Sequence, residues 1–277
     1  MGDGRIRDHP GQLLLVAFAV IVGIVLVIPI VIVLPLSIGE NRIMSFPPQG
    51  FTLDWYAEVI ESPRWASRLS ASLQVAIATA ILATILGTMT AVGMHRARMR
   101  GKRLLFAILL LPLIVPSVTV GIGMYFVWIE GWTVGPVAIG GNLVGTPVGY
   151  VLAHTVLALP YPFITVTASL VTVDRNLELA AGSLGASPWV TFRRITLPLV
   201  MPGVVAGLIL SFITSWDEVI IAILLASPRF ATIPVELFGQ IRQSPTPTAA
   251  ALSTLLMLAG LVAFVAAMAM RRRATTT

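Results

Sequence analysis

The chain has 277 residues, of which 57% are hydrophobic and only 11% are charged, and its mean hydropathy is +0.93. A soluble domain carries about 25% charged residues, so this composition excludes an ordinary soluble protein and favours a polytopic membrane protein. The absence of cysteine excludes disulfides, thiol nucleophiles and iron–sulfur ligation, and three scattered histidines do not make a multi-histidine metal site. We therefore expect no metal, no cofactor and no catalytic residues on this chain.

Six apolar stretches are each long enough to cross roughly 30 Å of hydrocarbon, which takes about 20 helical residues. Their apolar runs are continuous rather than alternating, which favours helices over barrel strands. The predicted spans are 12–36, 69–94, 104–129, 146–172, 199–226 and 249–270. The fold class is thus predicted as an all-α polytopic membrane protein, with one transmembrane domain over residues 1–277.

The first stretch also begins as a signal peptide does, because Arg5 and Arg7 precede an apolar run. The apolar core of a signal peptide has about 7–15 residues. The run from Leu13 to Leu36 is far longer and no small-residue cleavage site follows it cleanly, so we expect a retained first helix.

Basic residues are concentrated on one set of connections. The termini and the second and fourth connections carry Arg5, Arg7, Arg96, Arg98, Arg100, Lys102, Arg103, Arg175, Arg193, Arg194, Arg271, Arg272 and Arg273. The remaining connections carry Arg42, Arg64, Arg68, Arg229 and Arg242. The positive-inside rule then places both termini in the cytoplasm. Topology and contact with the lipid bilayer account for the basic excess, so we expect no nucleic-acid partner.

The connection after the fourth predicted span, residues 174–198, has helix-punctuating residues. Asp174 or Asn176 can cap a helix, Gly185 is a helix stop, and Ser187-Pro188 can begin a second short helix. An apolar stripe follows the cap at helical spacing: Leu177, Ala180, Ala181 and Leu184. The pattern predicts a short helix across the cytoplasmic end of the bundle, broken by a tight turn. It is either a surface that a soluble partner grips or an ordinary interfacial helix.

The stretch ELAAGSLGASPWVTFRRITLPLVMPG resembles the EAA loop of permeases of binding-protein-dependent ABC importers. The matching residues are Ala180, Ala181, Gly185, Ile195 and Pro198. Leu179 stands where the family usually has its Glu, and Glu178 lies one position earlier. The resemblance implies the type I importer permease fold, with six helices and a coupling helix between the fourth and fifth. The coupling residues that it implies are Glu178, Ala180, Ala181, Gly182, Gly185, Ala186, Ser187, Pro188, Ile195 and Pro198.

The same resemblance implies the partners and the location. Two ATPase subunits would dock on the coupling segment and carry the ATP and Mg, a view supported by the absence of any GxxxxGK[ST] phosphate loop in this chain. A second permease subunit, expected to be a different chain, would complete the pathway, and an extracytoplasmic solute-binding protein would deliver the solute. The chain itself would be a multi-pass transport subunit of the bacterial inner membrane, not an enzyme.

The fifth predicted span carries the chain's intramembrane acids. Intramembrane carboxylates are costly, and they usually face a cavity, pair with a base or stay protonated. Here they either line a pathway for a cation, or pair with the second permease or with Ser and Thr hydroxyls of this chain. The candidate pathway residues are Ser211, Phe212, Thr214, Ser215, Trp216, Asp217 and Glu218, of which Ser211, Thr214, Ser215 and Glu218 would form one helical stripe.

The Ser-Trp-Asp-Glu stretch is similar to the corresponding stretch of permeases for spermidine and putrescine, which implies a polyamine as substrate. Ser117 follows Pro116 where such permeases often carry an acid. Ferric iron, thiamine or another small solute are alternatives within the same importer class. An ATP-independent carrier or channel and an integral-membrane enzyme are competing classes. His154 within the fourth span is expected to be a hydrogen-bonded structural residue rather than a proton relay.

Overall fold

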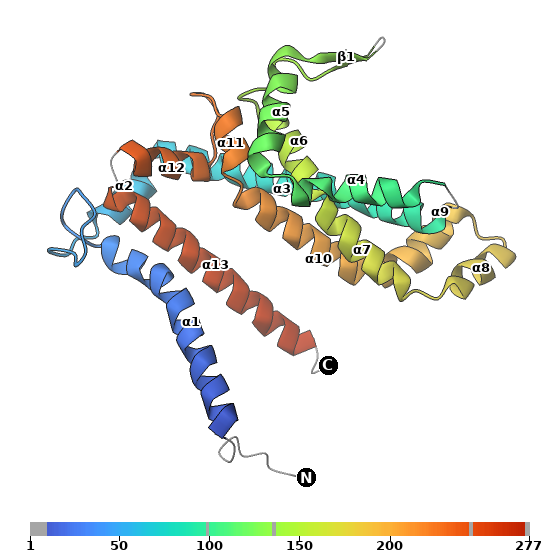
Figure 1. Ribbon diagram of the computed structural model, residues 1–277, viewed down its shortest axis with the longest axis horizontal. Coiled ribbons are helices and arrows are strands. Elements are labelled where there is room, and N and C mark those ends of the chain that lie inside the picture. Colours follow the sequence, from blue (N-terminus) through green and yellow to red (C-terminus); the bar gives the residue numbers. More distant parts are fainter. Residues whose placement is uncertain (1–9, 98–99, 135–136, 244–245, 275–277) are drawn as a thin grey trace. The chain divides into compact units, whose positions relative to one another are not determined.

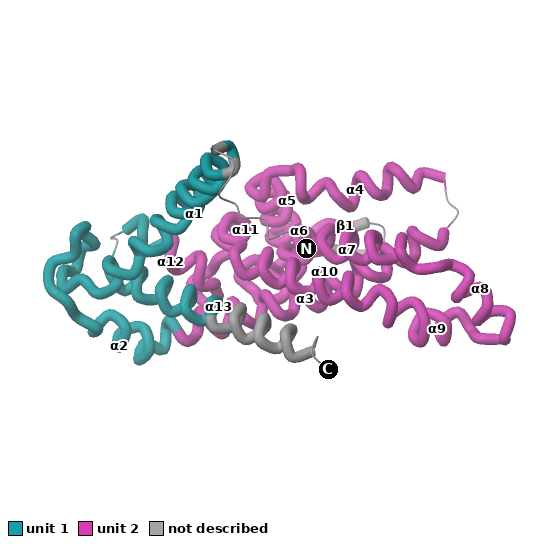
Figure 2. Tube along the Cα trace, turned by 90° about the horizontal axis from the view of Figure 1, so that it is seen from below, with its two compact units in different colours: residues 1–65, 239–277 teal, residues 66–238 magenta. Residues whose placement is uncertain are grey.

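The computed structural model describes residues 10–97, 100–134, 137–243 and 246–274. Arg5, Arg7 and Arg98, which contribute to the predicted orientation, lie outside the described residues. The chain divides into two compact units, residues 1–65 with 239–277 (unit 1) and residues 66–238 (unit 2) (Figure 2). The single transmembrane domain over residues 1–277 stays a prediction.

Unit 1 contains three helices: α1 (Pro10–Leu36), α2 (Asp54–Glu61) and α13 (Pro247–Ala274) (Figure 1). α13 contacts both α1 and α2. Two aromatic residues of α2 hold the loop that precedes it, because Trp55 Nε1 donates to the Gly39 carbonyl at 2.7 Å and the Tyr56 hydroxyl lies 2.6 Å from Ser37 Oγ. These aromatic residues therefore fasten α2 to the end of α1 through hydrogen bonds.

Unit 2 is built from two buried clusters. One surrounds Tyr150 and Ile221, and the other surrounds Phe163 and Val200. Its elements are α3 (Pro63–Arg96, from residue 66), α4 (Lys102–Ile114), α5 (Ser117–Glu130), β1 (Trp132–Val134), β2 (Val137–Ile139), α6 (Pro147–Ala158), α7 (Pro160–Val171), α8 (Arg175–Ser183), α9 (Pro188–Thr191), the π-helical turn η1 (Phe192–Thr196), α10 (Leu197–Trp216), α11 (Ile220–Leu225) and α12 (Ile233–Gln243, to residue 238). β1 and β2 pair antiparallel, with Trp132 opposite Ile139.

The described residues include three helices that are long and apolar enough to cross a membrane: Leu13–Leu36, Pro63–Arg96 and Pro188–Trp216. Two further spans result if each of two bent helix pairs is counted as one, which gives up to five. Among the described residues, the apolar stretch of α13, Pro247–Leu261, is shorter than a span. A multi-pass α-helical membrane protein is consistent with this architecture, and the number of six spans stays a prediction.

Two of the predicted spans are not single helices. The stretch 104–129 is divided into α4 and α5, which are bent by 102°, and the stretch 146–172 is divided into α6 and α7, bent by 42°. Both breaks fall at a proline. Val115, before Pro116, has the extended ψ of 130°. A proline ring lacks the amide donor and clashes with the preceding turn. Pro116 also pushes the residue before it out of the helical region, whereas Leu159, before Pro160, keeps a helical conformation. Hydropathy does not register this backbone effect.

The predicted span 199–226 is also interrupted. α10 ends at Trp216, and α11 begins at Ile220. The Glu218 carboxylate accepts a hydrogen bond from the Ile221 amide at 2.8 Å. Acidic side chains compete in this way with helical hydrogen bonds and favour helix starts over helix interiors. Asp217 and Glu218 therefore lie in a helix break, not on the continuous helix that the sequence predicted.

α7 and α10 approach each other closely through two glycines of α10. A Cβ built on Gly207 would lie 2.5 Å from Pro162 Cα, and one on Gly203 would lie 2.3 Å from Ser169 Oγ. The Thr165 hydroxyl donates to the Gly203 carbonyl at 2.7 Å across the same contact. Small residues four apart allow membrane helices to pack at short range and to add such hydrogen bonds.

Replacing Gly207 with Ala is expected to destabilise the protein by about 1–3 kcal/mol, because the new methyl group must displace the backbone of Pro162. Gly93→Ala is the matched control, since a Cβ there meets nothing within 4 Å. Thermal unfolding in detergent micelles compares the two variants. A Gly207→Ala protein as stable as the Gly93→Ala protein would show that this close contact is not required.

Candidate functional site

The coupling segment, residues 174–198, begins with a capped helix. The Asp174 carboxylate accepts a hydrogen bond from the Asn176 amide at 2.9 Å, and α8 follows from Arg175 to Ser183. This is the capped helix that the sequence predicts. None of the residues of α8 is buried, so the helix is not held by a hydrophobic face of its own.

α8 ends in a turn at Gly185 whose backbone conformation requires glycine. Gly185 has φ +82°, a left-handed value that residues with a Cβ rarely adopt. The Ala186 amide donates to the Ala181 carbonyl at 3.0 Å, and the Gly185 amide donates to the Gly182 carbonyl at 3.0 Å. These two bonds define a Schellman motif, which satisfies the last carbonyls of the helix. A Cβ at Gly185 would meet nothing within 4 Å, so the requirement is one of backbone conformation and not of space.

The second half of the segment is helical and continues into α10 without a loop. Ser187 caps it by accepting from the Val190 amide at 3.4 Å, with Pro188 in the first helical turn. α9 then passes into the π turn η1, which contains Ile195, and Pro198 lies in the first turn of α10. A proline cannot donate to the carbonyl four residues earlier, and a wider turn before it accommodates that missing bond.

A polar contact joins the coupling segment to the end of α3. Arg96, the last residue of α3, lies with its Nη2 2.6 Å from Glu178 Oε1 and donates to Thr196 Oγ1 at 2.9 Å. The Thr196 hydroxyl donates to the same Glu178 oxygen. Thr196 is fully buried, whereas Arg96 and Glu178 are partly exposed. The Arg96–Glu178–Thr196 contact therefore ties α8 to the end of α3 and to the start of α10.

The contact keeps Glu178 ionised. Burial alone raises the pKa of the Glu178 carboxyl, but the hydrogen bonds from Arg96 and Thr196 and the charges of Arg96 and His95 together lower the pKa below its ordinary value of 4.5. A carboxyl whose pKa is lowered by folding stabilises the fold above its unfolded pKa, and that contribution is lost as the pH falls through the lower, folded pKa. The contact should therefore persist throughout the neutral range.

Glu178→Gln and Arg96→Gln are each expected to increase hydrogen–deuterium exchange in residues 175–186, because α8 loses the contact that holds it. The double variant should exchange no faster than either single variant, since both changes remove one interaction. Arg175→Gln on the same helix is the control.

The same exchange measurement gives the pH dependence. The protection of α8 relative to Glu178→Gln should be constant above pH 4.5 and decline as the pH falls below this ordinary carboxyl value. Equal exchange in the wild type and in both single variants would show that the contact does not hold α8.

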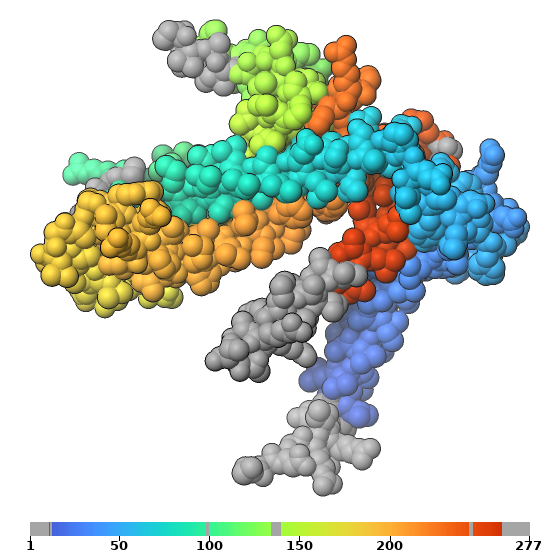
Figure 3. Space-filling view, turned by 180° about the vertical axis from the view of Figure 1, so that it is seen from behind, coloured from blue at the N-terminus to red at the C-terminus, as the bar shows by residue number. Residues whose placement is uncertain are grey.

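The coupling segment presents apolar side chains outward. Leu184 is 88% exposed and Trp189 is 67% exposed, on either side of the Gly185 turn. In the space-filling view, the yellow segment forms one end of unit 2 (Figure 3). Of the predicted coupling residues, Ala181, Ala186, Ile195 and Glu178 are half-buried, and Ala180, Gly182, Gly185, Ser187, Pro188 and Pro198 are exposed. Exposed apolar side chains on a segment that the Arg96–Glu178–Thr196 contact holds in place are suited to binding a protein partner.

The predicted substrate residues are divided between two environments. Ser211 and Ser215 are buried, and their hydroxyls bond within the chain: Ser211 Oγ to the Ala158 carbonyl at 3.3 Å, and Ser215 Oγ to His154 Nδ1 at 2.9 Å. Thr214 and the stacked rings of Phe212 and Trp216, with centroids 5.9 Å apart, are half-buried.

The two acids differ in the same way. Asp217 is exposed at the end of α10, whereas Glu218 is half-buried and caps α11. The structure therefore does not align Glu218 with Ser211 and Ser215 on one helical stripe, because the helix ends between them. His154 is hydrogen-bonded and buried, as the sequence predicts for a structural histidine.

Arg96, Thr196 and the Arg68–Glu236 ion pair were not predicted. Arg68 Nε lies 3.4 Å from Glu236 Oε2, and the partners of both ion pairs are far apart in the sequence. The sequence shows an acid in the coupling segment, Glu178, and a basic residue after a predicted span, Arg96, but it does not show that the two side chains meet. Within the described ranges, no group of His, Cys, Asp or Glu could hold a metal ion.

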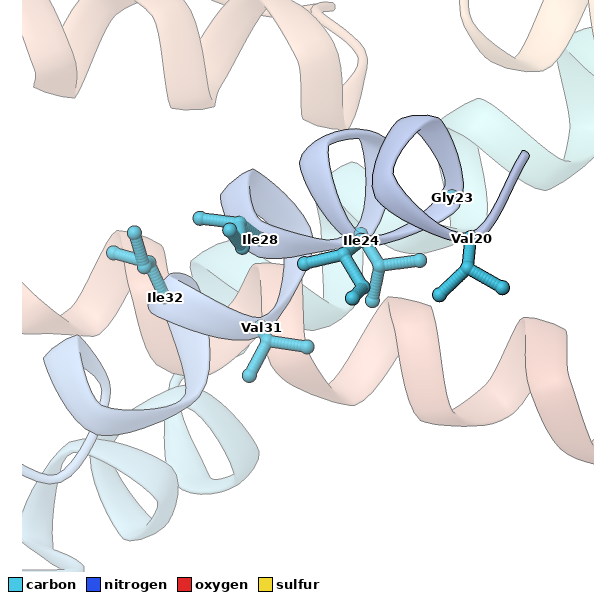
Figure 4. A pocket seen from close by; sticks show the side chains of 7 residues that line it. Val20, Gly23, Ile24, Ile28, Val31 and Ile32 are labelled. Atoms are coloured by element: carbon cyan, nitrogen blue, oxygen red, sulfur yellow. The ribbon is translucent and has the colours of Figure 1, made fainter. Parts of the chain in front are cut away.

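A groove of 460 Å³ on α1 offers no polar solute site. Its lining consists of valine, isoleucine and glycine side chains (Figure 4). The labelled residues are Val20, Gly23, Ile24, Ile28, Val31 and Ile32. Without a charged or hydrogen-bonding side chain, this surface suits lipid or an apolar protein face and not a charged solute.

Comparison with known proteins decides the family. The model of the family described as "binding-protein-dependent transport system inner membrane component" matches residues 83–275. The chain belongs to this family. It is an inner-membrane permease of a binding-protein-dependent ABC importer, similar to the permeases for spermidine and putrescine.

Three similar permeases are named for different solutes. The spermidine/putrescine transport system permease protein PotC of Escherichia coli is 30% identical over 82% of both chains, and the putrescine transport system permease protein PotI of Escherichia coli is 33% identical over 78% of this chain and 76% of its own. A putative 2-aminoethylphosphonate transport system permease protein, PhnV of Salmonella paratyphi A, is 31% identical over 76% of both. A solved bacterial ABC transporter involved in alginate import has a chain of the same fold, with a TM-score of 0.74 at 17% identity, covering 96% of this chain and 98% of its own.

Proposed function

We propose that this chain is a permease subunit of an ATP-driven importer for polyamines such as spermidine and putrescine. It forms half of the translocation pathway and is coupled to separate ATPase subunits through residues 174–198. The proposal rests on the coupling segment itself, because α8 has no buried residue and because Leu184 and Trp189 are exposed on either side of the Gly185 turn. Such a segment gains its burial only from a partner.

The proposed coupling uses rigid connections. An ATPase subunit that grips α8 and the Gly185 turn moves both ends of the segment, because the Arg96–Glu178–Thr196 contact joins α8 to α3 and α9 continues into α10. α10 contacts α7 closely through Gly203 and Gly207. A displacement of the turn is therefore passed to three membrane helices. The two ATPase subunits bind ATP with Mg and hydrolyse the ATP, and this chain carries no cofactor and performs no hydrolysis.

The proposed cargo follows from the end of α10. A polyamine carries protonated amines along an apolar chain. The exposed Asp217 carboxylate would bind an ammonium group, and the Trp216 ring, which is half-buried and stacked on Phe212, would add a cation–π contact. The names of PotC and PotI support this substrate class. PhnV, which is named for a phosphonate, shows that similar chains are assigned other solutes, so ferric iron, thiamine or another small solute are the alternative cargoes.

The proposed importer contains further subunits besides this chain and the ATPases. A second permease subunit, different from this chain, completes the pathway, and an extracytoplasmic solute-binding protein delivers the solute. Six helices cross the bacterial inner membrane, with both termini in the cytoplasm, as the distribution of basic residues supports.

Asp217→Asn is expected to reduce polyamine uptake in reconstituted vesicles about tenfold or more, as for the loss of a charge-assisted hydrogen bond. Glu218→Gln should have a smaller effect, because the amide oxygen of Gln can still accept from the Ile221 amide and cap α11. Asp54→Asn, which neutralises an exposed acid in unit 1, is the control.

Assembly with the ATPase should be unchanged in all three variants. Uptake kinetics that are unaffected by Asp217→Asn would remove this carboxylate from the pathway.

A further inference from the structure

A pocket of 380 Å³ lies where the end of α3, the start of α4 and the middle of α7 meet. Its walls are apolar. Met94 comes from α3, Phe106 from α4 and Phe163 from α7, and the two phenylalanine rings are in contact, with centroids 5.2 Å apart. The pocket is open to the surface of unit 2 and is lined by no acidic side chain. It has the wall chemistry of a site for a hydrocarbon chain.

Three basic side chains line the same pocket: His95 from α3, and Lys102 and Arg103 from the first turn of α4. Among the described residues, neither Lys102 nor Arg103 forms an ion pair. The neighbouring carboxylate of Glu178 is already held by Arg96 and Thr196. No described carboxylate of unit 2 therefore neutralises Lys102 or Arg103 in an ion pair.

The start of α4 adds to that positive potential. Its N-cap is Gly101, which has φ +85° and supplies no side-chain cap. The first amide groups of a helix without a cap remain available as donors, and the helix dipole favours an anion beside them. Lys102 and Arg103 thus lie at a helix end that itself attracts negative charge, directly beside apolar walls.

The apolar walls and the basic residues of the pocket together favour one kind of ligand. A free phosphate would use the cations but not the apolar walls, and an apolar helix of another protein would leave the cations unneutralised. A polyamine is repelled by Lys102 and Arg103. An anionic glycerophospholipid suits both the walls and the cations, because juxtamembrane basic residues attract anionic head groups and acyl chains seek apolar surfaces.

We propose that this pocket binds an anionic phospholipid, with its phosphate at Lys102 and Arg103 and an acyl chain against Phe106 and Phe163. The site is distinct from the Asp217 region and does not depend on the identity of the cargo. The bound lipid would lie beside His95, the residue before Arg96, and so next to the contact that holds the coupling segment.

Native mass spectrometry of the full-length chain tests the proposal. The protein is released from nanodiscs that contain phosphatidylcholine with or without phosphatidylglycerol. Wild type should retain phosphatidylglycerol in preference to phosphatidylcholine. The variant Lys102→Ala with Arg103→Ala should bind it about 30-fold more weakly, the loss expected from about 1 kcal/mol for each of two cations.

The matched control is Arg193→Ala with Arg194→Ala, a second pair of adjacent basic residues, both exposed, that does not line the pocket. It should retain the lipid as wild type does. Thr167→Phe places a ring in the pocket from α7 and should also reduce lipid retention while leaving both cations in place. Circular dichroism identifies any variant that fails to fold.

Three outcomes would overturn the proposal. The first is equal retention by the Lys102/Arg103 and Arg193/Arg194 variants. The second is displacement of the lipid by inorganic phosphate at concentrations that leave the protein folded, which would assign the cations to a free anion. The third is loss of phosphatidylcholine and phosphatidylglycerol alike in Thr167→Phe with no head-group preference in wild type, which would make the pocket an apolar docking surface.

Discussion

The Arg96–Glu178–Thr196 contact is the interaction on which the proposed coupling depends. α8 has no buried residue, so hydrophobic packing does not position it. The contact places an ionised carboxylate between the end of α3 and the buried hydroxyl of Thr196 at the start of α10. A partly exposed ion pair contributes only about 0.2–1 kcal/mol. The hydrogen bond from the buried Thr196 hydroxyl fixes the position of the Glu178 carboxylate. α8 therefore has a defined position although none of its residues is buried.

A weak but well-defined attachment suits a part that must move with a partner. The Gly185 turn is stiffened by its two backbone bonds, and α9 passes without a loop through η1 into α10. A force applied at the exposed Leu184 is therefore transmitted along helices rather than absorbed by a flexible linker. The Gly203 and Gly207 contact with α7 extends the same rigid path.

The sequence predicts best what is decided locally. The Asp174 cap, the Gly185 turn and the Ser187-Pro188 helix start each depend on residues only a few positions apart, and each is present. Hydropathy locates the apolar stretches but not the break at Pro116 or the one at Glu218, because an average over about 19 residues does not show where a helix loses a hydrogen bond.

Contacts between distant residues could not be predicted from one sequence. Arg96 and Glu178 are separated by 82 residues, and only folding shows that they meet. The off-register acid of the coupling segment was visible, since Leu179 stands where related loops carry Glu, but its partner was not. The predicted stripe of Ser211, Thr214, Ser215 and Glu218 likewise required one continuous helix through the fifth predicted span. The break at Asp217 separates an exposed carboxylate from two buried serine hydroxyls.

Docking of the Gly185 turn onto an ATPase subunit is the central claim, and the absence of cysteine from the chain allows a direct measurement. A single cysteine at position 184, where Leu184 is 88% exposed, gives the protein one thiol at the apex of the turn. A cysteine replacing Ile60, which is 71% exposed in unit 1, is the reference. With a thiol-specific photocrosslinker and the co-expressed ATPase, we expect a crosslinked permease–ATPase product from position 184 and none from position 60. Equal crosslinking at both positions, or none at position 184 in an assembled complex, would contradict this claim.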